Sequence, residues 1–215
     1  MMSFSNTGGT AASAPPGLQG HQLVLGGQKS GKSRHAEGLA AAWLSRPEAR
    51  ASVLATAHGH DEEMRARIAR HRQDRLPGLA TLEEPLQLAQ ALAGHSQPGH
   101  LIVVDCLTLW ATNWLMPLSG EADLAGFHAE KERLLALLPE LPGPVVFTSN
   151  EIGGGLIAMS REVRQFVDEL GLLHQGIRAR CQHLHWVVAG AVFLADATRW
   201  GAGRPPQGST AWQWA

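Results

Sequence analysis

The chain has 215 residues, of which 44% are apolar and 17% charged, with 18 basic and 19 acidic residues, 11 histidines and 2 cysteines. A chain of this length buries a sizeable core within one domain, so folding requires neither disulfides nor structural metals. The formal net charge of −1 gives no broad positive field, which argues against a nucleic-acid binder that works by counterion release. Cys106 and Cys181 form no C-x-x-C motif, as is typical of proteins in a reducing cytosol.

The two ends of the chain differ from its middle in composition. Residues 1–20 are rich in Gly, Ser, Ala, Thr and Pro and carry no charge, so we expect a disordered leader. We expect one domain over residues 21–195 and an irregular tail over 196–215. The longest strongly apolar run, Trp186–Ala195, is too short to span a bilayer, and no targeting signal is evident. These features predict a cytoplasmic protein.

Short apolar runs alternate with longer helical patterns along the domain. We expect strands at Gln22–Leu25, Ser52–Ala55, Leu101–Val104, Val145–Thr148 and Trp186–Val188. We expect helices at Lys32–Leu44, Glu62–Gln73, Pro85–Ala93, Leu107–Met116, Leu124–Leu138 and Ser160–Cys181. Repeated strand–helix–strand units imply right-handed crossovers, so the pattern predicts a doubly wound α/β fold, with a mostly parallel sheet and helices on both faces.

The strongest local motif follows the first expected strand. It satisfies the pattern G-x-x-x-x-G-K-[ST] with the residues Gly26, Gly27, Gln28, Lys29, Ser30, Gly31, Lys32 and Ser33. In such a P-loop, backbone N–H groups surround phosphate oxygens and the next helix directs its positive end at them. Lys32 would neutralise the β- and γ-phosphates, and Ser33 would be a Mg²⁺ ligand. The alternative is a glycine-rich turn without a ligand, but the motif predicts a P-loop NTPase-like fold.

A carboxylate ends another expected strand. Asp105 follows the apolar run Leu101–Val104, an arrangement by which P-loop proteins hold the metal or its water from a neighbouring strand. The alternative is that Asp105 caps the next helix. Because the P-loop is present, we favour the metal-binding role.

A charged segment, Asp61–Arg75, is expected to form a surface helix with His71 near its end. One interpretation is a solvated face on which His71 has no special role. The other is that nearby arginines converge on a triphosphate and disfavour imidazolium, which leaves neutral His71 free to attack phosphorus. The other histidines show no metal-ligand spacing, and we expect most of them to be surface residues.

With these segments in place, the chain resembles the bifunctional adenosylcobinamide kinase / adenosylcobinamide-phosphate guanylyltransferase family of cobalamin biosynthesis. The resemblance runs from about Leu23 to Val192. It is carried by Gly26–Glu37, Ala55–Ala57, Asp61–Arg72, Thr81–Glu83, Asp105–Thr108 with Asn113, Thr148–Gly153 and Val187–Gly190.

The resemblance implies two reactions at overlapping sites. A phosphoryl group would pass from ATP or GTP to adenosylcobinamide, and GTP would then guanylylate a histidine that hands GMP to the new phosphate. The matching histidine is His71, and Lys32 would act in catalysis. The resemblance also implies a homo-oligomer, a trimer. The Mg²⁺ predicted from the P-loop and the acidic strand end would be held by Ser33 and Asp105.

Nucleotide contacts carried over from the family fall on the P-loop residues 26–33 and on Ala55, Thr56, Ala57, Arg72, Gln73, Asp74, Arg75, Glu83 and Asp105. From donor and acceptor chemistry, the Glu83 carboxylate can accept hydrogen bonds from N1–H and the exocyclic amine of guanine, a pattern that adenine lacks.

The chain departs from the family pattern in two places. Residues 158–162 replace a Pro-Glu-Asn type segment, and His174-Gln175 replaces a common Asn-Gln pair. Both places lie in the half that we expect to face the corrinoid or another subunit.

Two alternatives remain open from the residues alone: a P-loop kinase of another small metabolite, and a nucleotide-switched binding protein.

Overall fold

The computed structural model describes residues 18, 20–57, 79–155 and 159–196. One seven-stranded sheet forms its centre, with the strands in the order β3-β2-β4-β5-β1-β6-β7. All neighbours pair in parallel except β6 and β7, which pair antiparallel. The strands are β1 (Gln22–Gly26), β2 (Arg50–Ala55), β3 (Ala80–Glu83), β4 (His100–Asp105), β5 (Val145–Asn150), β6 (His183–Val188) and β7 (Ala191–Asp196).

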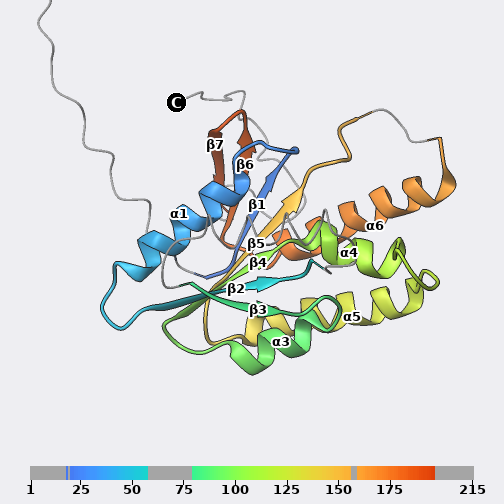
Figure 1. Cartoon of the computed structure of the whole chain (residues 1–215). Coiled ribbons are helices and arrows are strands. Elements are labelled where there is room, and N and C mark those ends of the chain that lie inside the picture. Colours follow the sequence, from blue (N-terminus) through green and yellow to red (C-terminus); the bar gives the residue numbers. More distant parts are fainter. Residues whose placement is uncertain (1–17, 19, 58–78, 156–158, 197–215) are drawn as a thin grey trace, which may run out of the picture.

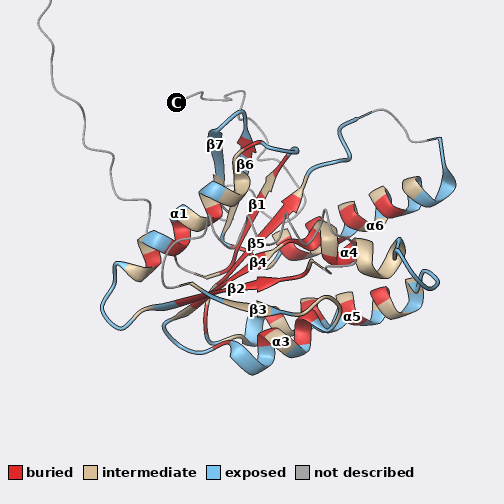
Figure 2. Ribbon diagram, in the orientation of Figure 1, coloured by how far each residue is buried: buried red, intermediate tan, exposed pale blue. Residues whose placement is uncertain are grey.

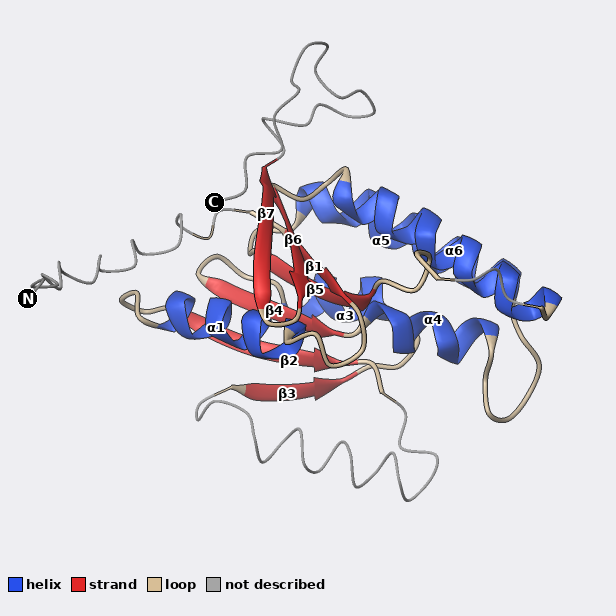
Figure 3. Ribbon diagram, turned by 90° about the horizontal axis from the view of Figure 1, so that it is seen from above, coloured by secondary structure: helices blue, strands red, loops and turns tan. Residues whose placement is uncertain are grey.

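Helices cover both faces of this sheet (Figure 1). The helices are α1 (Lys32–Leu44), α3 (Leu88–His95), α4 (Leu107–Leu115), α5 (Leu124–Leu137), the 3₁₀ helix η1 (Leu138–Glu140) and α6 (Arg161–Arg178). Helix α1 packs on one face, against β1, β2, β4 and β5. Helices α4, α5 and α6 lie together beyond the other face (Figure 3).

Two apolar clusters hold these layers together. Helix α1 contributes Leu39 and Trp43 to one cluster, which includes Val24 and Val103 from the sheet. The opposite cluster contains Trp110, Phe127, Phe147 and Leu170, among other residues. Successive strand residues alternate between the two clusters, as Val103 and Val104 do, because side chains of a strand point to opposite faces. Figure 2 shows the buried residues concentrated in the central strands, whereas β7 is exposed.

The predicted α/β fold, mostly parallel and covered on both faces, is confirmed. Helix α1 has the expected bounds, and Ser160 caps α6 as expected, since its hydroxyl accepts a hydrogen bond from Val163 N at 3.2 Å. Helix α3 begins at Leu88 rather than at Pro85, because the Glu84 carboxylate accepts hydrogen bonds from Leu86 N and Gln87 N and forms a turn there.

Two strands were missing from the expectations. Strand β3 is short and borders the sheet, and its half-exposed residues give little apolar signal. Strand β7 follows a turn at Gly190, whose φ of 84° suits glycine, and it turns the apolar run Trp186–Ala195 into a hairpin. The expected strand at Trp186–Val188 therefore begins three residues earlier, at His183.

Some expectations fall outside the described residues. The helix predicted over 62–73, with His71 and the residues Arg72 to Arg75, lies there, as do most of the predicted leader and tail. Within the expected leader, Leu18 is described and is buried in the α1 cluster. No helix in the described ranges has the length and apolar character needed to cross a bilayer.

Candidate nucleotide-binding site

The P-loop connects the end of β1 to the start of α1. Gly31 precedes the helix with a φ of 103°, and Lys29 also has a positive φ, of 55°. Gly26 is required by close approach, since a Cβ there would lie 2.4 Å from Ser30 Oγ and 2.5 Å from the Val187 carbonyl oxygen. Gly26 and Gly31 thus serve the tight path of the loop, whereas a Cβ on Gly27 would meet no atom within 4 Å.

The amino end of α1 is suited to an anion. No side chain caps this end, and its first turn has no acidic residue. Helices α3 and α4 share these features, whereas Asp123 and Ser160 cap α5 and α6. The first-turn N–H groups of α1 therefore retain their capacity for phosphate oxygens, assisted by the helix dipole. Lys32 Nζ lies 3.1 Å from the Gly27 carbonyl oxygen, so the lysine side chain folds back over the loop.

The turn between β6 and β7 supports the P-loop from outside. Gly190 N donates a hydrogen bond to the Ser30 carbonyl oxygen at 2.9 Å. A Cβ on Gly31 would lie 3.6 Å from Gly190 Cα, so the turn at Gly190 packs closely against the P-loop backbone. The β6–β7 hairpin, which the sequence did not reveal, therefore fixes the shape of the loop.

Asp105 lies on the same face of the sheet as the P-loop but not on the strand next to it. Strand β5 separates β1 from β4, so the expectation of a neighbouring strand was wrong by one strand. Thr148 of β5 bridges this gap, because its Oγ1 lies 3.2 Å from Asp105 Oδ1. The N-cap of α4 is Cys106, not Asp105, which argues against the capping alternative.

The three predicted contacts at the end of β2, Ala55, Thr56 and Ala57, also lie at the carboxyl ends of the strands. Ala55 is paired with Asp105 in register, and Thr56 Oγ1 donates to the Cys106 carbonyl oxygen at 2.7 Å. Asn113 Nδ2 donates to the Thr56 carbonyl oxygen at 2.8 Å. Ala57 follows and is half-buried. These bonds hold the segment 55–57 against α4 at its N-cap, Cys106, and at Asn113 in its last turn.

Glu83 lies at the carboxyl end of β3, which is an edge strand of the sheet. It ends β3, is exposed, and is paired with Ala55 in register. Four strand spacings, about 19 Å, separate its strand from β1. The structure therefore brings together the P-loop, Asp105 and residues 55–57. Glu83 lies further away along the carboxyl ends of the strands, since its strand is about 19 Å from β1.

The protein offers few ligands for a metal ion here. Ser33 and Asp105 supply a hydroxyl and a carboxylate oxygen, and the described residues contain no group of three or more His, Cys, Asp or Glu side chains that could hold a metal. Mg²⁺ commonly takes one or two protein oxygens and keeps waters and phosphate oxygens as its other ligands. The donor set at this edge therefore fits Mg²⁺ bound together with a nucleotide.

Histidines form two buried networks that sequence reasoning missed. His35 Nε2 lies 2.8 Å from His185 Nδ1, and His185 Nε2 lies 2.6 Å from Gln22 Oε1. Since Gln22 Oε1 only accepts, His185 donates from Nε2 and receives a hydrogen bond from His35. Burial, assisted by the neighbouring histidines, lowers the pKa of His185 to about 3. This neutral chain joins α1 to β1 and β6 beneath the P-loop.

The second network lies on the opposite face, around Ser149. His174 Nε2 is 2.7 Å from Ser149 Oγ, which is 3.0 Å from Thr108 Oγ1. Three of the eight described histidines, His21, His174 and His185, are buried and so differ from the expected surface residues; His95 is exposed and the other four are half-buried. Their partners lie up to 163 positions away in the chain, so no local pattern could reveal them.

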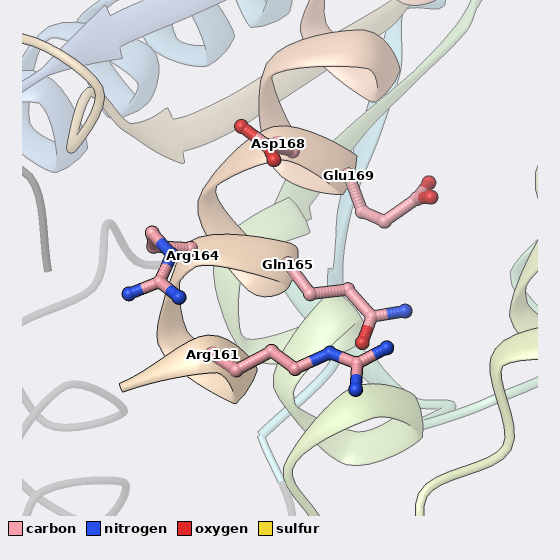
Figure 4. A pocket seen from close by; sticks show the side chains of 5 residues that line it. All are labelled: Arg161, Arg164, Gln165, Asp168 and Glu169. Atoms are coloured by element: carbon pink, nitrogen blue, oxygen red, sulfur yellow. The ribbon is translucent and has the colours of Figure 1, made fainter. Parts of the chain in front are cut away.

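Two hollows lie outside the P-loop. One, of about 310 Å³, is lined by side chains of both charges on α6: Arg161, Arg164, Gln165, Asp168 and Glu169 (Figure 4). The other, of about 390 Å³, lies near the opposite edge of the sheet and includes Arg50, His95 and His100. Neither contains a P-loop residue, so neither adds to the nucleotide site.

A strand, a phosphate-binding loop and a helix, with an acidic strand end on the same face, define a nucleotide-binding protein of the P-loop class. The chain belongs to the cobinamide kinase / cobinamide phosphate guanyltransferase (CobU) family, whose sequence profile matches residues 22–194. It is a bifunctional enzyme of adenosylcobalamin biosynthesis that uses nucleoside triphosphates as substrates.

Similar proteins cover most of the chain. The bifunctional adenosylcobalamin biosynthesis protein CobP of Pseudomonas aeruginosa is 45% identical over 168 residues, which is 78% of this chain and 92% of that protein. CobU of Escherichia coli is 33% identical over 177 residues, 78% of this chain and 95% of its own length. The match ends before the tryptophan-bearing tail.

Two solved structures show a distant likeness. The flagellar accessory protein FlaH of Methanocaldococcus jannaschii has a TM-score of 0.40 and 13% identity, covering 80% of this chain and 74% of that one. The P4 protein of bacteriophage phi6 in complex with ADP has a TM-score of 0.41 and 14% identity, covering 89% and 59%. No functional conclusion rests on similarities this distant.

Proposed function

We propose that the chain phosphorylates adenosylcobinamide with ATP or GTP and then transfers GMP from GTP, through guanylylated His71, to give adenosyl-GDP-cobinamide. The observation that carries this proposal is the bare amino end of α1 behind the P-loop, with Asp105 on the same face of the sheet. Family membership supplies the substrate class.

In the kinase step, the P-loop amides and Lys32 hold the triphosphate. The substrate hydroxyl oxygen forms a bond to the γ-phosphorus, the bond to the β–γ bridging oxygen breaks, and the diphosphate leaves with that electron pair. The hydroxyl proton is released to water. Charge on the transferred group is balanced by Lys32 and by the amides at the start of α1, which are already oriented before reaction.

Ser33 and Asp105 would hold Mg²⁺ at this site. When bound, Mg²⁺ supplies positive charge to the phosphate oxygens. The Thr148 hydroxyl lies 3.2 Å from Asp105 Oδ1 and 3.1 Å from the Val104 carbonyl oxygen, so its one proton is shared between the carboxylate and the strand backbone. Thr56 Oγ1 and Cys106 fix the segment beside it through hydrogen bonds of 2.7 and 2.9 Å.

In the guanylyl step, a neutral imidazole nitrogen of His71 attacks the α-phosphorus of GTP. An N–P bond forms, the α–β bridging oxygen leaves with pyrophosphate, and the phosphate oxygen of the corrinoid then displaces the histidine. Splitting the transfer lets pyrophosphate leave before the bulky acceptor is aligned. We assign Arg72, Gln73, Asp74 and Arg75 to nucleotide binding in this step, as the resemblance implies.

Glu83 is proposed as the residue that recognises guanine. It ends β3 at the carboxyl edge of the sheet and is exposed, so its carboxylate can reach a base. Strand β3 lies about 19 Å from β1, so a GTP whose phosphates occupy the P-loop would extend its guanosine over the carboxyl ends of β4 and β2 to reach Glu83. A carboxylate that accepts from N1–H and the exocyclic amine selects guanine over adenine.

We further propose that the chain is a homo-oligomer, a trimer as the resemblance implies, and that it works in the cytoplasm. The β6–β7 hairpin supports self-association, because it borders the sheet and its side chains are apolar and exposed. Trp186, Val188, Val192, Phe193 and Leu194 are 41–50% exposed. Trp186, Val188 and Phe193 share one face of the hairpin, and Val192 and Leu194 lie on the other, because Trp186 is paired with Phe193 and Val187 with Val192. Exposed apolar residues on an edge hairpin are typical of a surface covered by another chain.

The kinase assignment is tested with γ-labelled ATP and adenosylcobinamide. We expect label on the corrinoid in wild-type protein and none with Lys32→Ala. A P-loop kinase of another metabolite would leave the corrinoid unlabelled, and a nucleotide-switched binding protein would bind ATP without transferring the label to any acceptor.

A further inference from the structure

Within the described part of the chain, four buried side-chain atoms have no hydrogen-bond partner: Ser30 Oγ, Trp114 Nε1, Asn150 Oδ1 and His183 Nδ1. Buried polar atoms are nearly always paired, so each exception requires an explanation. Two of the four adjoin Gly26. A Cβ on Gly26 would lie 2.4 Å from Ser30 Oγ, and Asn150 is paired with Gly26 in strand register. The unpaired oxygens are therefore concentrated at the mouth of the P-loop.

Asn150 lies between the two parts of the nucleotide site. It is the last residue of β5, the strand that separates β1 from β4. Its side chain shares a face with Thr148, two residues earlier, because strand side chains alternate with a period of two. Thr148 Oγ1 is 3.2 Å from Asp105 Oδ1. The carboxamide of Asn150 thus lies on the P-loop face, between Gly26 and Asp105.

The backbone around Asn150 is fixed on two sides. Asn150 N donates to Thr108 Oγ1 at 2.8 Å, and Glu151 N donates to the Gly26 carbonyl oxygen at 3.1 Å. The first bond connects β5 to α4, and the second connects it to the P-loop strand. A side chain on such a rigid support is already positioned before a ligand arrives, which is the arrangement that catalytic groups require.

We propose that Asn150 is a catalytic residue of the kinase step, whose Oδ1 accepts the hydrogen bond of the attacking substrate hydroxyl. This inference rests on the proposed function. The hydroxyl oxygen bonds to the γ-phosphorus, the β–γ bridging oxygen leaves with its electron pair on the diphosphate, and the proton is released to water. A carboxamide is not basic, so Asn150 orients the hydroxyl and its lone pair toward phosphorus without taking the proton.

The role differs between the two reactions. In guanylyl transfer the nucleophile is an imidazole nitrogen that attacks the α-phosphorus, so there is no hydroxyl for Asn150 to orient. Nucleotide binding depends on the P-loop amides and Lys32, which a change at Asn150 leaves in place. Loss of Asn150 should therefore slow phosphoryl transfer while ATP binding and guanylylation continue.

The experiment compares Asn150→Leu and Asn150→Ala with wild type. Leucine is similar in size to asparagine and lacks the unpaired oxygen and the amide nitrogen, and we expect the variant to fold. We expect kcat for adenosylcobinamide phosphorylation to fall about 100-fold, the effect of losing one oriented hydrogen bond in a transition state. The KM for ATP and the labelling of the protein by α-labelled GTP should stay within about threefold of wild type.

Trp114→Phe is the matched control. It removes another unpaired buried polar atom, Trp114 Nε1 on α4, and should leave kcat unchanged. The proposal is overturned if both Asn150 variants keep kcat within about threefold of wild type, or if the ATP KM worsens and guanylylation falls in parallel with kcat. If wild-type protein transfers no phosphoryl group to adenosylcobinamide, the proposed function itself fails, which is a distinguishable result.

Discussion

His174 of α6 and Ser149 of β5 are joined by a hydrogen bond of 2.7 Å between Nε2 and Oγ, and both side chains are buried. Burial lowers the pKa of His174 to about 4, although Glu151 partly opposes this shift. The imidazole is therefore neutral at neutral pH. It belongs to a network, through Ser149 and Thr108, that connects α6 and α4 to the end of β5.

This pKa predicts how stability depends on pH. Between pH 6.5 and about 4 the unfolded chain binds a proton at His174 that the folded chain does not, so the free energy of unfolding falls as the pH falls. One such group contributes a slope of about 1.4 kcal/mol per pH unit at full difference in protonation. His185, with a pKa of about 3, acts in the same direction. Urea unfolding at pH 7, 6 and 5 measures the slope.

His174→Asn tests the assignment, because asparagine, which the family resemblance implies at this place, does not titrate. We expect the variant to fold. Between pH 6 and 5, the change in its free energy of unfolding should be smaller than in wild type by about 1.4 kcal/mol per pH unit, the contribution of one proton. Gln175→Asn, at the adjacent exposed residue of α6, replaces one side chain that does not titrate by another and should leave the slope unchanged. An unchanged slope in His174→Asn would show that this histidine is not held neutral by the fold.

Replacing Gly26 of the P-loop and Gly38 of α1 with alanine should change the free energy of unfolding in opposite directions. Gly26→Ala should lower the free energy of unfolding by about 1–3 kcal/mol, because its Cβ would overlap the Val187 carbonyl oxygen, a backbone atom. Gly38→Ala, in α1 with no atom within 4 Å of the new Cβ, should raise it by about 0.5–1 kcal/mol. Chemical denaturation of both variants distinguishes close packing from a general tolerance of alanine.

Two lysine substitutions distinguish a specific role of Lys32 at the phosphates from a general effect of removing one positive charge. Lys32→Ala should reduce kcat/KM for ATP about 100-fold or more, because the charge balancing the phosphoryl group is lost. Lys131→Ala provides the control: its ammonium bonds Glu169 Oε2 at 2.9 Å on the helical face, and kinase activity should be unaffected. Steady-state kinetics with adenosylcobinamide measures both, and equal losses would exclude a specific role for Lys32.

The apolar hairpin predicts a change of assembly. Trp186 and Phe193 are paired across β6 and β7, with ring centroids 5.9 Å apart, and both are exposed. The double variant Trp186→Ser, Phe193→Ser should shift the mass measured by light scattering from an oligomer to a monomer. Leu118→Ser, a 72% exposed leucine after α4, should not. A double variant with the wild-type oligomeric mass would exclude the hairpin as the interface.

The sequence predicted those features that depend on local pattern. The P-loop, the bounds of α1, the Ser160 cap and the acidic end of β4 all follow from residues close together in the chain. Segment Thr148–Gly153 was also visible as part of the family resemblance. Its polar residues directly follow a buried strand, which is a usable signal for a site at the carboxyl edge of a sheet.

Strand order and buried polar contacts were beyond prediction because they depend on long-range pairing. Nothing local indicates that β5 enters between β1 and β4, so Thr148 was not expected to contact Asp105. The burial of His185 depends on Gln22 and His35, at the other end of the domain. Strand β3 was missed because an edge strand of four residues has little apolar periodicity.

The central claim is tested most directly by incubating the protein with α-labelled GTP in the absence of corrinoid. We expect covalent, acid-labile label on wild-type protein, as a phosphoramidate should give, and none on His71→Ala. His95→Ala, at an exposed histidine of α3, should be labelled like wild type. Label that persists on His71→Ala, or its absence from wild-type protein, would contradict guanylyl transfer through His71.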